Sequence, residues 1–136
     1  MLFLYNIITL LAAQLLKIVA LFSPKMKLFV DGRKSVFQTL DNKIQSSDKT
    51  IWFHAASLGE YEQGLPVIEA IKQQFPTHKI VVTFFSPSGY EVRKNNAIAD
   101  VTVYLPLDTI SNAKQFIKLV YPEMVFFIKY EYWPNY

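Results

Sequence analysis

The sequence contains no cysteine, which excludes disulfide bonds, thiolate metal ligands and a cysteine nucleophile. Its two histidines, His54 and His78, are too few and too far apart to predict a metal site. The net charge is only +3, and no basic run or basic stripe with interleaved aromatic residues occurs. This balance is compatible with an anionic surface or substrate, but it does not indicate nucleic acid binding.

Several glycine-rich and catalytic motifs are also missing. No G-x-G-x-x-G occurs, so a dinucleotide cofactor is not expected, and no GK[ST] of a Walker loop follows any glycine. No G-x-S-x-G surrounds a serine, so a hydrolase triad is not supported. We therefore expect no metal, no cofactor and no nucleic acid partner.

What the chain has instead is a high apolar content, 51% of its 136 residues. This length allows one globular domain plus an appendage. Residues 1–22 are apolar with few exceptions, and as a helix they would extend about 33 Å, enough to cross a hydrocarbon core of about 30 Å. Four basic residues follow directly and place the remainder in the cytoplasm by the positive-inside rule: Lys25, Lys27, Arg33 and Lys34.

The polar residues within this apolar segment leave its topology open. They fall within roughly 140° of arc on a helix: Asn6, Thr9, Gln14 and Lys17. A helix with such a face can lie in the membrane interface or turn that face toward protein, instead of spanning the bilayer. A buried core helix is a third interpretation. Membrane attachment is the one we favour.

Apolar strands and single helices alternate in the rest of the chain. Strands are predicted at residues 50–56, 79–85, 101–105 and 124–128. The first helix begins near Gln63 or bends at Pro66, the second covers residues 87–95, and Asp108 or Ser111 caps the third. Strands that are apolar throughout predict an α/β fold with a parallel, Rossmann-like sheet covered on both sides. We divide the chain into an anchor helix (1–22), a basic and polar connection (23–49) and a Rossmann-like domain (50–136).

The chemistry of the chain gathers where the strands end, and ligands of such sheets bind beyond the carboxyl ends of their strands. The first exit reads HAASLGE. Glu60 there is a candidate catalytic group or a first-turn glutamate favoured by the helix dipole, and Ser57 is more often an N-cap than a nucleophile. Gly59 supplies an unusual conformation or lets a ligand approach the backbone. For His54, a strand-end histidine whose hydrogen bonds are satisfied is the interpretation we favour over a catalytic one.

Two further exits add candidate binding groups. Ser86, Ser88 and Gly89 in SPSG precede a helix N-terminus and resemble an anion cradle. The exit KYEYWPN combines Lys129 and Glu131 with three aromatic residues, a set that suits a sugar face beside a phosphate or carboxylate. An aromatic cluster at the edge of the core is the alternative.

The ordered set of an apolar anchor, Gly32-Arg33, WFHAASLGE, VVTFFSPSG, VYLPLD and YEYWPN resembles the N-terminal domain of the Kdo transferases. That resemblance covers essentially the whole chain. It implies a two-domain GT-B glycosyltransferase that transfers 3-deoxy-D-manno-octulosonic acid (Kdo) from CMP-Kdo to a lipid A precursor, with inversion, at the cytoplasmic face of the inner membrane. The chain would be the acceptor-side half, without the C-terminal donor domain and inactive by itself.

The resemblance also implies roles for individual residues. Glu60, in S-x-G-E, would be the general base, and an acceptor phosphate would meet Arg33. The acceptor-binding residues as a whole would be Ser57, Gly59, Arg33, Ser86, Ser88, Gly89, Lys129 and Glu131. Many relatives have Glu-x-Glu where this chain has Lys129-x-Glu131. The role of the first glutamate is then lost, moved to Glu131, or replaced by a cation. Two alternatives to a Kdo transferase are another membrane-associated GT-B glycosyltransferase and a non-catalytic, membrane-tethered Rossmann-like binding module.

Overall fold

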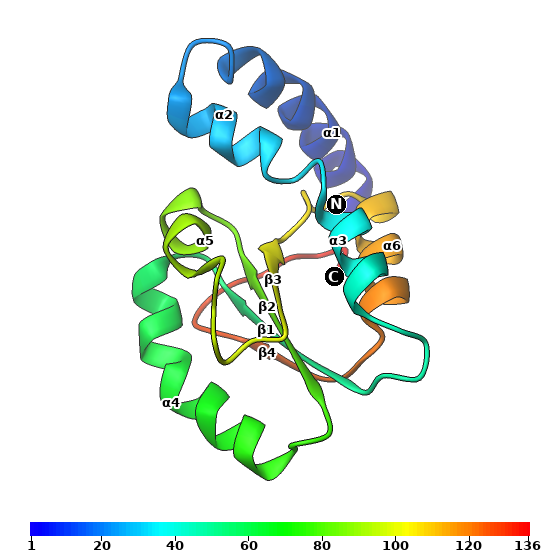
Figure 1. Cartoon of the computed structure of the whole chain (residues 1–136). Coiled ribbons are helices and arrows are strands. Elements are labelled where there is room, and N and C mark those ends of the chain that lie inside the picture. The colour runs from blue at the N-terminus through cyan, green and yellow to red at the C-terminus, as the bar shows by residue number, and fades with distance from the viewer.

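The computed structural model describes all residues, 1–136, as an α/β fold with a parallel sheet (Figure 1). The elements follow in the order α1 (Leu2–Val19), α2 (Pro24–Asp31), α3 (Val36–Lys43), β1 (Thr50–Ala55), α4 (Leu58–Gln74), β2 (Lys79–Phe84), α5 (Pro87–Arg93), β3 (Val101–Tyr104), α6 (Ile110–Val120) and β4 (Pro122–Phe127). The strand order is β3-β2-β1-β4, and every pair is parallel. The predicted parallel sheet is confirmed.

Helices cover both faces of this sheet because successive strand residues point to opposite sides. On one face, Trp52 of β1 packs in a buried cluster with Leu40 of α3 and Phe116 of α6. On the other face, Ile51 and Phe53 of β1 pack in a second cluster that contains Tyr61 and Ile68 of α4. In Figure 1, α3 and α6 accordingly lie on one side of the strands and α4 on the other.

The edge strand β4 departs from the expectation that all strands are covered on both sides. Its residues alternate between half-buried and exposed, and both Val125 and Phe127 are exposed. Phe126 stacks on Phe53, with ring centroids 4.8 Å apart, so the covered side of β4 belongs to the α4 cluster. Full coverage is confined to β1 and to most of β2 and β3.

Several helix boundaries also differ from the prediction. Residues 23–49, expected to be a polar connection, form α2 and α3, and α3 contributes Val36 and Leu40 to the core. Helix α4 starts at Leu58, earlier than predicted, and continues through Pro66. Helix α6 is capped by neither Asp108 nor Ser111; its cap is Thr109, whose hydroxyl accepts a hydrogen bond from the Asn112 amide at 3.2 Å.

Candidate active site

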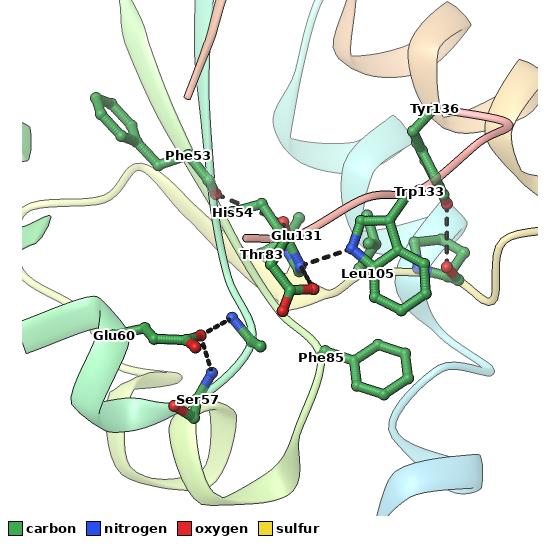
Figure 2. A network of polar contacts seen from close by, with 12 residues as sticks. Phe53, His54, Ser57, Glu60, Thr83, Phe85, Leu105, Glu131, Trp133 and Tyr136 are labelled. Carbon is green, nitrogen blue, oxygen red and sulfur yellow. Dashed lines mark hydrogen bonds and ion pairs between the residues drawn. The ribbon is translucent and has the colours of Figure 1, made fainter. Parts of the chain in front are cut away.

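The turn from β1 into α4 holds Glu60 by two main-chain hydrogen bonds. Ser57 is the N-cap, and Glu60 is the third residue of the helix. Glu60 Oε2 accepts a hydrogen bond from the amide of Ala56 at 2.7 Å and one from the amide of Ser57 at 3.1 Å (Figure 2). These bonds supply partners for amides at the start of a helix, where a carboxylate is also favoured by the helix dipole. The carboxylate is therefore fixed in place, with both amides on the same oxygen.

A second carboxylate, that of Glu131, lies at the same edge of the sheet. The segment after β4 folds back across this edge and brings Glu131 Oε2 to 3.6 Å from His54 Nε2. Its side chain is only 18% exposed. Burial raises the pKa of the Glu131 carboxyl, and the charge of Glu60 raises it further, against the opposing effect of a hydrogen bond from Trp133. The two carboxylates are thus close enough to influence each other.

His54 is fully buried, and both of its ring nitrogens have partners. Its Nδ1 lies 2.8 Å from Thr83 Oγ1, and Trp133 Nε1 donates to its Nε2 at 3.3 Å (Figure 2). An indole N–H can only donate, so Nε2 accepts and the ring proton is assigned to Nδ1. Burial, aided by the charge of Arg33 and opposed by the bond with Thr83, lowers the pKa of His54 from 6.5 to about 4. His54 is neutral at pH 7, as expected for a histidine whose hydrogen bonds are satisfied.

Arg33, expected to bind acceptor phosphate, instead has three main-chain carbonyls as partners. Its guanidinium donates to the carbonyl oxygens of Phe29 at 2.8 Å, Phe85 at 2.7 Å and Leu105 at 2.8 Å. It also lies over the Phe29 ring, 3.7 Å from the centroid. Burial lowers the pKa of Arg33 to about 9, so the group stays charged at pH 7. Arg33 therefore joins the end of α2 to the exits of β2 and β3.

The glycines and serines of the first two exits have distinct environments. Gly59 does not have a positive φ, so the conformational explanation for a glycine there is wrong. No atom lies within 4 Å of the position a Cβ would take, which leaves open space beside the backbone. Gly89 is buried against the ring of Phe84, and its lack of a Cβ allows that contact. Ser86 is the N-cap of α5, and its Oγ lies 2.7 Å from that of Ser88.

Lys129, also predicted as a site residue, is exposed just beyond the end of β4. It follows β4 in a left-handed conformation with φ of 67°, which residues other than glycine adopt rarely. Its side chain is exposed and forms no ion pair. Lys129 is thus a free cation two residues before Glu131.

Sequence reasoning missed several residues that organise this edge. Asp108 was interpreted as a cap, but it is 2% exposed and accepts hydrogen bonds from Tyr5 Oη at 2.6 Å and from the Asn135 amide at 3.2 Å. Thr83 joins His54 to Trp52, whose indole N–H donates to the Thr83 hydroxyl at 2.8 Å. Only their positions in the sequence could have indicated that Asp108 and Asn135 belong to this edge: Asp108 follows the third strand, and Asn135 belongs to YEYWPN.

Comparison with known proteins places this arrangement in a family. The model of the 3-deoxy-D-manno-octulosonic-acid transferase family, Glycos_transf_N, matches residues 31–136. The 3-deoxy-D-manno-octulosonic acid transferase of Aquifex aeolicus is 34% identical over 93 residues, covering 68% of this chain and 26% of the relative. That of Haemophilus influenzae is 35% identical over 86 residues, covering 62% and 20%. That of Chlamydia trachomatis is 28% identical over 107 residues, covering 77% and 25%. The chain spans about a quarter or less of the length of these relatives, and it belongs to the Kdo transferase family.

Proposed function

We propose that the protein to which this chain contributes transfers Kdo from CMP-Kdo to a lipid A precursor, with Glu60 as the general base. The observation that carries this proposal is the position of Glu60. In a chain of this family, its carboxylate is fixed by two main-chain amides at the ligand-binding edge of a parallel sheet. The relatives are named as transferases of this sugar. The donor, the acceptor and the base are our assignment.

The chemical step needs one base. Both amides bond to Oε2 of Glu60, so Oε1 can accept the hydrogen bond of an acceptor hydroxyl. As that oxygen attacks the anomeric carbon of Kdo, its proton passes to Glu60, the new C–O bond forms, and the bond to the CMP phosphate breaks with its electron pair leaving on CMP. A phosphate leaves readily, so no paired acid is required, in contrast to a glycosidase. A single displacement of this kind inverts the anomeric centre.

The neighbouring groups would bind the acceptor. The open space beside Gly59 allows a sugar to approach the backbone next to Ser57. The half-buried Glu131 carboxyl, with its raised pKa, can share a hydrogen bond with an acceptor hydroxyl. Lys129 is an exposed cation available to a phosphate. The N-cap Ser86, with Ser88 and Gly89 of the first turn of α5, would form a second acceptor-binding site at the adjacent exit. Arg33 would act indirectly, by holding the exits of β2 and β3 together.

We place the protein at the cytoplasmic face of the inner membrane. The support is α1, an 18-residue helix long and apolar enough to cross a membrane, none of whose residues is buried. The basic residues that follow it favour the cytoplasmic side.

The test is a transfer assay with the full-length protein, a phosphorylated lipid A precursor and CMP-Kdo, followed by mass spectrometry of the lipid. We expect the mass of the lipid to rise by Kdo residues, with release of CMP. Parallel reactions with other activated sugars provide the comparison. Transfer from another donor but not from CMP-Kdo would assign the protein to a different glycosyltransferase activity. Acceptor binding without any transfer would favour a binding module.

A further inference from the structure

Helix α1 has its faces arranged in the opposite way to a helix of a soluble protein. Its half-buried residues recur every three or four positions and form one stripe toward the rest of the chain: Tyr5, Asn6, Thr9, Ala13 and Leu16, continued by Ala20 at the cap. The large apolar side chains point outward and are more than half exposed: Phe3, Leu4, Ile8, Leu11, Leu15 and Ile18. An apolar face of this length turned to the outside indicates a partner that is itself apolar.

The N-terminal end of α1 is hydrogen bonded to the α/β domain. Tyr5 Oη donates to Asp108 Oδ2 at 2.6 Å, and Asn135 Nδ2 donates to Asn6 Oδ1 at 2.9 Å. Asp108 is buried, and a buried carboxylate requires hydrogen-bond donors such as Tyr5 Oη. In Figure 1 the N-terminus correspondingly lies beside α6 and near the C-terminus. The start of α1 is therefore held to the same body that carries the sheet.

The C-terminal end of α1 returns to the same body through α2. The chain turns after Val19, and α2 runs back alongside α1 in Figure 1. At the end of α2, Arg33 bonds the carbonyls of Phe85 and Leu105, the first residues after β2 and β3. Both ends of α1 are thus connected to the ligand-binding edge of the sheet.

A spanning helix does not fit this arrangement. Eighteen residues extend about 27 Å, so a helix across a hydrocarbon core of about 30 Å would put Tyr5 and Asn6 at the side opposite α2. That would break the hydrogen bonds to Asp108 and Asn135. The intervening α2 cannot cross back, because it has only eight residues and includes Lys25 and Lys27.

The space between α1 and the domain is lined for an anionic lipid. A cavity of about 720 Å³ has apolar walls from Leu16, Val30, Phe37 and other residues. Lys17, Lys27 and Lys34 line it, together with Arg33 and a single carboxylate, Asp31, which already pairs with Lys34 at 2.6 Å. The lining is therefore apolar with an excess of positive charge, which complements an acyl chain ending in a phosphate.

We propose that α1 lies in the plane of the membrane interface without crossing it, and that a bilayer phospholipid with an anionic head group occupies the cavity beneath it. The apolar face of α1 enters the acyl region, and the N-terminus stays on the same side as the sheet. The proposal rests on membrane association, which belongs to the proposed function, and adds its topology and its lipid partner. It also places the bilayer beside the edge that carries Glu60, because Asn135, which bonds Asn6 of α1, is four residues from Glu131 in the site.

The absence of cysteine makes the topology directly measurable. The full-length protein, with any cysteine of its remaining sequence replaced, is prepared in two single-cysteine forms. One has an N-terminal Gly-Ser-Cys extension, and the other is Ser47→Cys, in the exposed turn before β1. Both are added to preformed sealed vesicles, so that the α/β domain stays outside, and are labelled with a membrane-impermeant maleimide before and after detergent.

We expect both cysteines to be labelled to the same fraction before detergent. Labelling of the N-terminal cysteine only after detergent, while Ser47→Cys is labelled before it, would show a spanning helix and overturn the proposal. A protein that does not float with the vesicles would contradict membrane association itself. Neither outcome depends on Kdo transfer.

The lipid partner is tested by flotation with phosphatidylcholine vesicles, with and without phosphatidylglycerol. Replacing Lys17 and Lys27 by glutamine should weaken binding to the anionic vesicles about fivefold per lysine and leave binding to neutral vesicles unchanged. Lys118→Gln, an exposed lysine in the last turn of α6, is the matched control. Equal effects of the cavity lysines on neutral and anionic vesicles would contradict a partner with an anionic head group.

Discussion

Protonation of His54 should destabilise the folded chain in mildly acidic solution. The side chain is fully buried, and its pKa falls from 6.5 to about 4 on folding, mainly because burial disfavours the charged ring. Between these two values the unfolded state binds a proton that the folded state does not, so the free energy of unfolding decreases as the pH falls. Each pKa unit corresponds to about 1.36 kcal/mol. Lowering the pH from 7 to 4 should therefore remove about 3 kcal/mol through this one residue.

The assay is urea unfolding of the detergent-solubilised chain at several pH values between 7 and 4, compared with His54→Gln. The glutamine variant lacks the titrating ring, so its free energy of unfolding should depend less steeply on pH by about 1 kcal/mol per unit in this window. Glu131, whose pKa is raised, acts in the opposite direction, but it is present in both proteins and cancels in the comparison. Identical pH dependences for the two proteins would refute the neutral, buried state of His54.

Two further substitutions test the remaining parts of the site. Arg33→Lys should lower the free energy of unfolding by about 2–4 kcal/mol, because one ammonium group cannot replace a guanidinium that bonds three carbonyls; urea unfolding measures this, and a change below about 0.5 kcal/mol would contradict the assigned role. Gly59→Ala should keep or slightly raise stability, since a Cβ meets no atom within 4 Å, while kcat/KM of the full-length enzyme falls if the acceptor approaches there. Unchanged kinetics would remove Gly59 from the acceptor site.

The sheet was predictable because each of its strands can be recognised from the residues of that strand and the turns beside it. Four apolar runs bounded by turns predict buried parallel strands, and β1 and β2 are indeed covered on both faces. The strand exits then meet at one edge as a consequence of parallel pairing. Helices α2 and α3 were missed because each has only eight residues, so their helical state depends on packing of Phe29, Val36 and Leu40 against distant elements.

The roles of Arg33 and Asp108 were not predictable for a related reason. Arg33 bonds carbonyls 52 and 72 residues away, and Asp108 bonds Tyr5 across 103 residues. A basic residue after an apolar helix and an aspartate before another helix have frequent local roles, phosphate binding and capping, and these were the roles assigned. Only the folded arrangement shows that both residues are hydrogen-bond partners of distant segments.

The most direct test of the central claim is the rate of Kdo transfer by Glu60→Gln in the full-length enzyme. Glutamine keeps the shape and still presents an oxygen to the amides of Ala56 and Ser57, but it cannot take a proton. Glu62→Gln, an exposed glutamate on the same helix that pairs with Arg93, is the matched control and should retain full activity. With folding verified by urea unfolding, kcat of Glu60→Gln should fall by about 10²–10⁴, the usual contribution of a general base. A loss below about tenfold in the folded variant would contradict Glu60 as the base.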